Sequence, residues 1–218
     1  MTDGLLLRAR TRARISAPPA GLLLYARSRT VPRALAVLLA TTALAVWAAH
    51  GLDAYVDSNR RVPAVALAPL LAAAVIGASL YTASEELDRT AARPWWQRRL
   101  VHLLALTALA AALLSVAVLG HGSVFGPPAM IRNTLGCTGV TVAAAAVLGA
   151  RLSWLPAFGY VSAVYLASAG AHGRAVTMWA WPVQPGGEAG AWAMALGAFV
   201  VGGALYVVRG ARAEGMRA

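Results

Sequence analysis

The sequence predicts an all-α integral membrane protein with six transmembrane helices, and three observations lead to this fold class. Of the 218 residues, 59% are hydrophobic and 12% are charged, whereas soluble domains have roughly 45–50% and roughly 25%. Six stretches approach or reach the roughly 20 apolar residues that a bilayer core requires. Arginines flank these stretches mostly on one side of the predicted membrane. This composition excludes a soluble enzyme, a disordered tail and, because Cys137 is the only cysteine, a secreted disulfide scaffold.

The first 33 residues form a basic lead-in with seven arginines. Residues 20–29 combine leucines and Tyr25 with Arg27 and Arg29, a mixture typical of a helix that lies in the membrane interface. We therefore predict an interfacial amphipathic helix in which Arg27 and Arg29 reach lipid phosphates. Residues 1–19 are predicted to be a disordered basic tail, and no signal peptide fits, because no small-residue cleavage site follows a short apolar core.

The transmembrane domain is predicted to cover residues 34–208, and a cytoplasmic tail follows at 209–218. The fourth and fifth spans nearly abut at Arg151 and Leu152, and Pro156 marks a break near the start of the fifth. The six predicted spans are Ala34–His50, Val62–Thr82, Leu100–Gly120, Thr134–Ala150, Ser153–Ala171 and Gly190–Val208.

The arginines also predict the orientation. All 19 basic residues are Arg, and 15 of them fall on the side of the two termini. Only Arg60, Arg61, Arg132 and Arg174 fall on the other side. Because cytoplasmic segments carry the excess of basic residues, we predict a multi-pass protein of the cell membrane with both termini in the cytoplasm. The net charge of +11 therefore reflects topology, and we expect no nucleic-acid partner.

Several kinds of energy coupling are excluded or disfavoured. All eight acidic residues fall outside the six predicted spans, so no carboxylate is available there for a coupling proton or sodium ion. A cation site built from backbone carbonyls stays open. The chain has no lysine, which excludes a standard Walker A motif. Any ATP hydrolysis is therefore expected on another chain.

Two motifs of intramembrane hydrolases are present only in part, and we expect no enzymatic activity. The run from Glu85 to Arg89 is one residue short of the E-E-x-x-x-R motif of CAAX-type metalloproteases. The run from Gly77 to Leu80 matches the short G-x-S-x of rhomboid-type serine proteases, and His102 falls at a similar depth on the next span. A serine among small residues is common in membrane helices, which favours ordinary packing.

The outer ends of the spans carry histidines and tryptophans. His50, His121 and His172 could bind haem iron or zinc there, but no fixed spacing supports it, so no metal site is predicted. The outer-loop region of interest contains Trp179, Trp181 and Pro182. For its tryptophans we favour an aromatic belt at the membrane surface over a substrate platform.

The loop between the second and third spans predicts a short helix on the cytoplasmic side. Ser84 is a suitable N-cap, the acidic residues that follow lie near the positive end of the helix dipole, and Pro94 ends the helix or starts the next one. An ordinary topology-setting loop is the alternative. The residues predicted to anchor the following turn among lipid headgroups are Trp95, Trp96, Arg98 and Arg99.

This layout resembles an ABC-2-type transporter permease. Residues 86–103 (ELDRTAARPWWQRRLVHL) and 131–156 (IRNTLGCTGVTVAAAAVLGARLSWLP) look like actinobacterial members of that family. The resemblance implies that the lead-in is a connecting helix and that residues 176–181 form a re-entrant element. It also implies a coupling helix that docks on a separate ATPase subunit, which holds ATP and Mg. The residues assigned to that coupling helix are Glu85, Glu86, Asp88, Arg89 and Arg93.

The family's permease subunits form dimers, so a second permease subunit is an expected partner beside the ATPase and the lipid bilayer. For Ala198 and Gly202 in the sixth span, packing within the chain is favoured over a dimer contact. The brief connection around Arg151 departs from the family pattern, because it leaves little room for a second docking element. The expected function is export of an amphipathic or hydrophobic substrate. A haem-handling membrane protein and a non-transporting scaffold or immunity protein are the alternatives.

Overall fold

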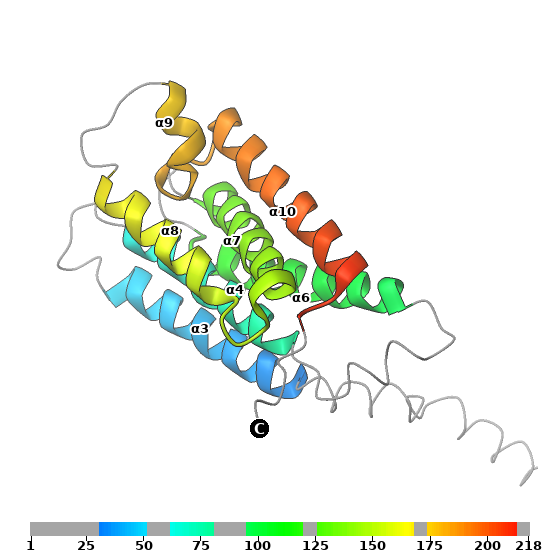
Figure 1. Cartoon of the computed structure of the whole chain (residues 1–218). Helices are drawn as coiled ribbons and strands as arrows, with labels where there is room; N and C mark the ends of the chain where they lie inside the picture. The colour runs from blue at the N-terminus through cyan, green and yellow to red at the C-terminus, as the bar shows by residue number, and fades with distance from the viewer. Residues whose placement is uncertain (1–30, 52–61, 81–94, 120–125, 168–173, 213–218) are drawn as a thin grey trace, which may run out of the picture.

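The computed structural model describes residues 31–51, 62–80, 95–119, 126–167 and 174–212, which form helices and turns with no strand among them. Figure 1 shows the helices packed side by side as a bundle, with the short α9 at one end. The all-helical prediction is confirmed for this part of the chain. The elements are α3 (Val31–Gly51), α4 (Val62–Ser79), α6 (Trp95–Ala117), α7 (Pro127–Leu148), α8 (Trp154–Ala167), α9 (Arg174–Trp179), the 3-10 helix η2 (Trp181–Val183) and α10 (Ala189–Arg209).

Three of these helices, α6, α7 and α10, are long and apolar enough to cross a membrane by length and composition. The other main helices, α3, α4 and α8, contribute shorter apolar stretches at Ala34–Leu44, Ala66–Ser79 and Trp154–Ala167. The described part of the chain thus has the character of a membrane protein.

The start of α7 corrects the predicted boundary of the fourth span. The helix begins at Pro127, seven residues before the expected Thr134. Gly126 is its N-cap and prolines occupy the first positions. Amides in the first turn of a helix have no intrahelical acceptor, so proline, which lacks the amide hydrogen, is tolerated there. Arg132, assigned from sequence to an outer loop, therefore lies in the second turn of a helix and is fully buried. The polar residues Arg132 and Asn133 can lie inside the helix, because carbonyls of the loop described below accept their hydrogen bonds.

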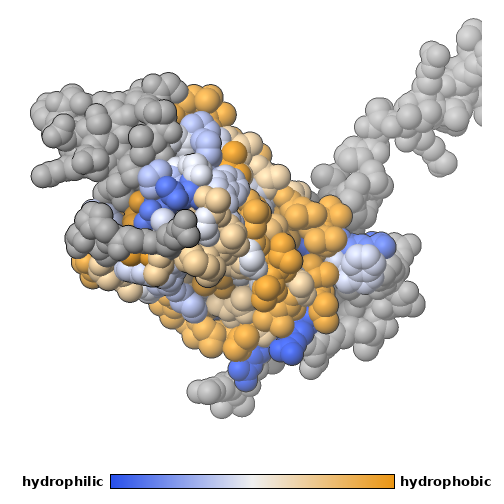
Figure 2. Space-filling view, turned by 90° about the horizontal axis from the view of Figure 1, so that it is seen from above, coloured by the Kyte–Doolittle hydropathy of each residue, from blue (hydrophilic) through white to orange (hydrophobic). Residues whose placement is uncertain are grey.

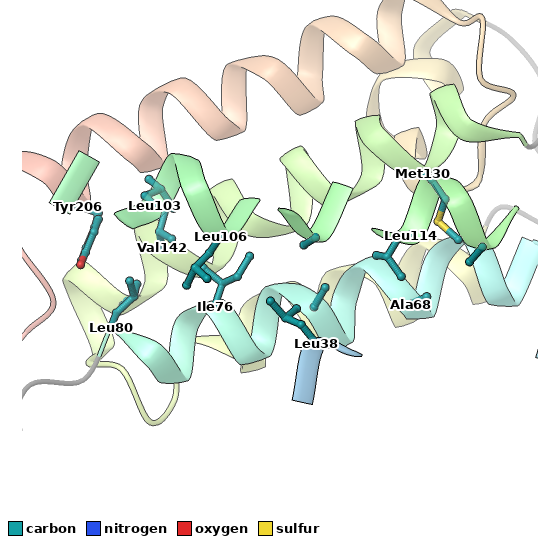
Figure 3. Close-up of a cluster of buried hydrophobic side chains, with 14 of the residues drawn as sticks. Leu38, Ala68, Ile76, Leu80, Leu103, Leu106, Leu114, Met130, Val142 and Tyr206 are labelled. Atoms are coloured by element: carbon teal, nitrogen blue, oxygen red, sulfur yellow. The ribbon is translucent and has the colours of Figure 1, made fainter. Parts of the chain in front are cut away.

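The core lies around α7, which contacts α4, α6, α8 and α10. Figure 3 shows the larger of two buried clusters, with Tyr206, Leu80 and Leu103 toward one end and Met130 and Leu114 toward the other. Between helices in lipid, close packing and hydrogen bonds supply the stabilisation, since lipid tails are as apolar as leucine. The second cluster contains Ala66, Ala73, Cys137, Val161, Trp181, Ala191 and Ala195.

The sides of the bundle are apolar. Figure 2, which shows the molecule from above, has hydrophobic residues over much of the visible described surface and hydrophilic residues gathered in a few patches. Large side chains such as Leu39, Val101, Leu166 and Val208 are exposed. Soluble monomers rarely expose apolar patches of this extent, so the surface matches a protein surrounded by lipid.

Candidate functional site

The first turns of α7 bind the loop between η2 and α10. The guanidinium of Arg132 donates from Nη1 to the Pro185 carbonyl at 2.6 Å and from Nη2 to the Gln184 carbonyl at 2.7 Å. The neighbouring Asn133 donates from Nδ2 to the Pro182 carbonyl at 2.7 Å. Two adjacent side chains thus hold three carbonyls within four residues. We call Arg132 and Asn133, with the carbonyls they bind, the loop clamp.

The two clamp side chains also orient each other. Nε of Arg132 donates to Oδ1 of Asn133 at 3.1 Å, and both side chains are fully buried. Glu188, the N-cap residue of α10, interacts electrostatically with Arg132. A buried arginine is costly unless its donors are satisfied. Here neutral carbonyls and one amide oxygen satisfy three of its donor positions, while Glu188 supplies the opposite charge.

Trp181 fixes the same loop from its other side. Its indole is 3% exposed, stacks on Tyr160 with ring centroids 6.0 Å apart, and covers Gly136 of α7. A methyl group at Gly136 would overlap the indole ring, so glycine is what lets Trp181 lie against the helix. A buried tryptophan does not lie among lipid headgroups, so the aromatic-belt interpretation is wrong for Trp181.

Two further hydrogen bonds complete the arrangement. The Tyr160 hydroxyl donates to the Trp179 carbonyl, and Nε1 of Trp192 in α10 donates to the Gly186 carbonyl at 2.8 Å. The segment 179–186 is therefore bound by side chains from α7, α8 and α10. Its 3-10 helix η2 also contacts α4. The short α9 and η2 thus fill one end of the bundle as a packed element.

The structure places part of the sequence-predicted outer-loop region in this site. Trp181 and Pro182 are buried in it. Trp179 is 37% exposed, and its backbone carbonyl accepts the hydrogen bond from Tyr160. Sequence reasoning missed Arg132, Asn133 and Tyr160. The signal available for the first two was a charged residue and an amide four and five positions after the second proline of a Gly-Pro-Pro helix start.

The predicted interfacial residues lie elsewhere. Trp95 is the first residue of α6, Trp96 and Arg98 are exposed on its first turn, and Arg99 donates from Nη1 to the Val207 carbonyl at 3.5 Å. These residues belong to a long helix rather than to a loop before it. The coupling-helix residues Glu85, Glu86, Asp88, Arg89 and Arg93, with Arg27 and Arg29, lie outside the described residues.

The structure brings Ser79 and His102 together. Oγ of Ser79 and Nε2 of His102 are 3.3 Å apart, and both side chains are buried. The Ser79 hydroxyl donates to the Ile76 carbonyl at 2.6 Å. When the single hydroxyl hydrogen is directed at Ile76, Oγ is left to accept from the Nε2–H tautomer of His102. A serine nucleophile needs the reverse arrangement, with its proton directed at the imidazole. The pair therefore joins α4 to α6 as an interhelical contact.

Within the part of the chain that the structure describes, no group of three or more His, Cys, Asp or Glu side chains is arranged to hold a metal ion. Of the three outer histidines, His50 lies in the last turn of α3. His121 and His172 lie outside the described residues.

Comparison of the chain with family models, curated proteins and solved structures finds no match.

Proposed function

We propose that the chain is the transmembrane permease subunit of an ATP-driven exporter of the ABC-2 type. In this proposal the chain is a multi-pass protein of the cell membrane with both termini in the cytoplasm. Its six spans are α3, α4, α6, α7, α8 and α10. Among these helices α8 is the shortest, with 14 residues. The next shortest, α4, has 18 residues, a length of about 27 Å at about 1.5 Å per residue. That length approaches the roughly 30 Å of a bilayer core.

The observation that carries the proposal is the packed element before α10. Its 3-10 helix η2 and the residues that follow it are bound by polar contacts at one end of an apolar bundle, and α9 packs beside them. In lipid, non-helical backbone is tolerated only where protein satisfies its polar groups, and the loop clamp supplies these bonds. A short re-entrant element before the last span is also what the resemblance to ABC-2 permeases implies.

The driving force is assigned to a separate ATPase subunit. No acidic residue falls within the predicted spans and the chain has no lysine for a nucleotide-binding motif, so neither ion coupling through a carboxylate nor ATP binding at a Walker A site fits. ATP and Mg bind on the ATPase, which docks on the segment containing Glu86 and Arg89. A second permease subunit completes the assembly.

The proposed class of cargo rests on the kinds of residues along the described helices. The described helices are lined with apolar and small residues, and Glu188 is the one acidic residue among the positions described. A strongly charged solute would find few partners along such helices. The proposed cargo is therefore an amphipathic or hydrophobic molecule.

Purification from native membranes in mild detergent tests the partner. An affinity-tagged chain is expected to retain an ABC ATPase that mass spectrometry identifies, and addition of ATP is expected to produce phosphate release by the complex. Recovery of the folded chain with no ATPase would contradict the proposal and favour a non-transporting scaffold or immunity protein. A Soret absorbance band in the same preparation would favour a haem-handling protein.

Charge reversal tests the docking segment. Glu86→Arg, Arg89→Glu and the double exchange should each lower ATPase retention, because the exchanged pair presents the wrong charges to the partner. If the two residues only pair with each other within a helix, the double exchange restores retention, which would overturn the docking assignment. Asp57→Arg, in a loop predicted on the opposite side, is the matched control and should retain the ATPase.

A further inference from the structure

One end of the helix bundle gathers five arginines. Arg98 and Arg99 lie in the first turns of α6, Arg151 lies in the turn between α7 and α8, Arg209 ends α10, and Arg212 follows it. We call these five residues the arginine end.

Hydrogen bonds place the helix ends that carry these residues next to each other. The Arg99 side chain reaches the Val207 carbonyl near the end of α10. The backbone N–H of Arg212 donates to the Ala145 carbonyl at 2.9 Å, and its Nη1 donates to the Val147 carbonyl at 3.0 Å. The start of α6 and the last turns of α7 and α10 therefore meet at one surface.

The charge of this surface is not balanced by described carboxylates. Glu188 is the sole acidic residue among the described positions, and it lies at the other end of α10, about 30 Å away for a helix of this length. Residues 81–94 join α4 to α6 and lie outside the described residues. They carry three acidic and two basic residues, so an excess of positive charge remains.

Exposed apolar side chains occupy sequence positions next to or near these cations. Leu152 follows Arg151, Leu148 stands three residues before it, and Val208 precedes Arg209 with 79% of its surface exposed. Trp154 and Leu155 continue the exposed apolar surface along the first turn of α8. Cations at the rim of an apolar surface match the boundary between the phosphates and the acyl chains of a lipid leaflet.

We propose that the arginine end binds the headgroup of an anionic phospholipid. Arg209 and Arg212 hold the phosphate, and Leu148 and Leu152 contact the acyl chains. The Arg212 guanidinium is positioned by its bond to Val147 and remains exposed, so other N–H donors can form the paired bonds that arginine makes with phosphate. The adjoining apolar surface favours a lipid over free phosphate or an acidic protein. This binding does not depend on the transport proposal.

Native mass spectrometry of the full chain tests this site. The protein is delipidated in detergent and mixed with equal amounts of phosphatidylglycerol and phosphatidylcholine that have the same acyl chains. The unmodified protein is expected to retain phosphatidylglycerol preferentially. The preference should fall about fivefold for each arginine removed, as expected for basic residues near an anionic membrane surface. Equal retention of the two lipids by the unmodified protein would overturn the proposal.

The variants separate charge from structural damage. Arg209→Gln with Arg212→Gln should lose the preference, while Arg209→Lys with Arg212→Lys should keep part of it, because lysine keeps the charge but not the paired donors. Arg174→Gln removes an arginine at the start of α9 and should change nothing. Because Arg212 also binds the end of α7, the single variant Arg209→Gln keeps the test decisive if the double variant unfolds. An unchanged lipid preference in Arg209→Gln would contradict the proposal.

Two further outcomes identify other ligands. Displacement of phosphatidylglycerol by millimolar inorganic phosphate would mean that the site recognises free phosphate, and the lipid proposal would fail. Loss of a co-purifying acidic protein in the glutamine variants, with lipid preference intact, would assign the surface to protein docking and would equally overturn it.

Discussion

Gly202 of α10 lies against the backbone of Gly139 of α7, so closely that a methyl group at Gly202 would overlap the Gly139 carbonyl. A methyl group at Gly139 would in turn overlap the backbone of Ala198 and Phe199. Reciprocal contact of this kind lets two helices approach at backbone distance, the usual role of small residues in membrane helices. The spacing of Ala198 and Gly202 is therefore used within the chain, as expected from the sequence.

We predict that Gly202→Ala and Gly139→Ala each destabilise the protein by about 1–3 kcal/mol, since the atoms in the way are backbone atoms that cannot rotate aside. Thermal unfolding of the full chain in detergent measures the change. Gly197→Ala, on the same helix but with open space around it, is the control. It should be neutral or stabilising by up to about 1 kcal/mol, because alanine favours helix over glycine. Equal destabilisation by all three would contradict the close contact.

The loop clamp gives a second prediction. Arg132→Gln removes the fork that binds the carbonyls of the half-buried Gln184 and Pro185, at a cost of about 1 kcal/mol for each carbonyl left without its donor. Hydrogen exchange should accelerate at the amides of residues 183, 184 and 186–188 and stay unchanged in the middle of α6. Arg132→Lys keeps the charge but not the fork, and should give an intermediate effect. Unaltered exchange at residues 183–188 would show that the segment is held by other contacts.

Gly136 and Trp181 should be energetically coupled. Gly136→Ala forces the new methyl group into the indole ring, which is buried and stacked on Tyr160 and so has no free space to move into. We expect about 1–3 kcal/mol of destabilisation. Combining it with Trp181→Leu, which removes the ring, should cost less than the sum of the single changes. Strict additivity in this double-mutant cycle would contradict the contact.

The apolar stretches were sufficient to predict the helices but not what lies between them. Residues 34–50 and 190–208 fall within α3 and α10 to within three residues at each end, because helices in lipid must satisfy their backbone internally and length follows from the apolar run. The start of α7 was misplaced because polar residues were taken to lie outside the span. Arg132 is buried only because carbonyls more than fifty positions away in the chain bind it.

The candidate site was recoverable from sequence only in part. The Trp-Pro-rich loop was identified as notable, but the burial of Trp181 depends on Gly136 and Tyr160 from two other helices. Likewise, Ser79 and His102 share a polar contact across 23 positions. Spacing along one helix predicts neighbours on that helix, whereas contacts between helices depend on how the helices pack.

The Ser79–His102 geometry predicts that Ser79 is not a nucleophile. A fluorophosphonate probe, which modifies activated serines, should leave Ser79 unlabelled, because its side chain is 2% exposed and the Ile76 carbonyl competes with His102 for the hydroxyl hydrogen. His102→Gln, which keeps an N–H donor, should preserve stability better than His102→Leu, which leaves the Ser79 oxygen without its donor. Labelling of Ser79 that disappears in both His102 variants would instead establish a serine hydrolase.

Cys137 offers a direct report on whether the packed element stays in place. Its side chain is 1% exposed and lies in the same buried cluster as Trp181, so a maleimide should label the native protein slowly and the unfolded protein at once. Because Arg132→Gln weakens the bonds that hold the loop carrying Trp181, it should raise the labelling rate about tenfold for each ~1.4 kcal/mol lost from the closed state. Met178→Ala, at an exposed position on α9, is the control and should leave the rate unchanged. If Arg132→Gln and Met178→Ala label at the same rate, the loop clamp does not control access to this cluster.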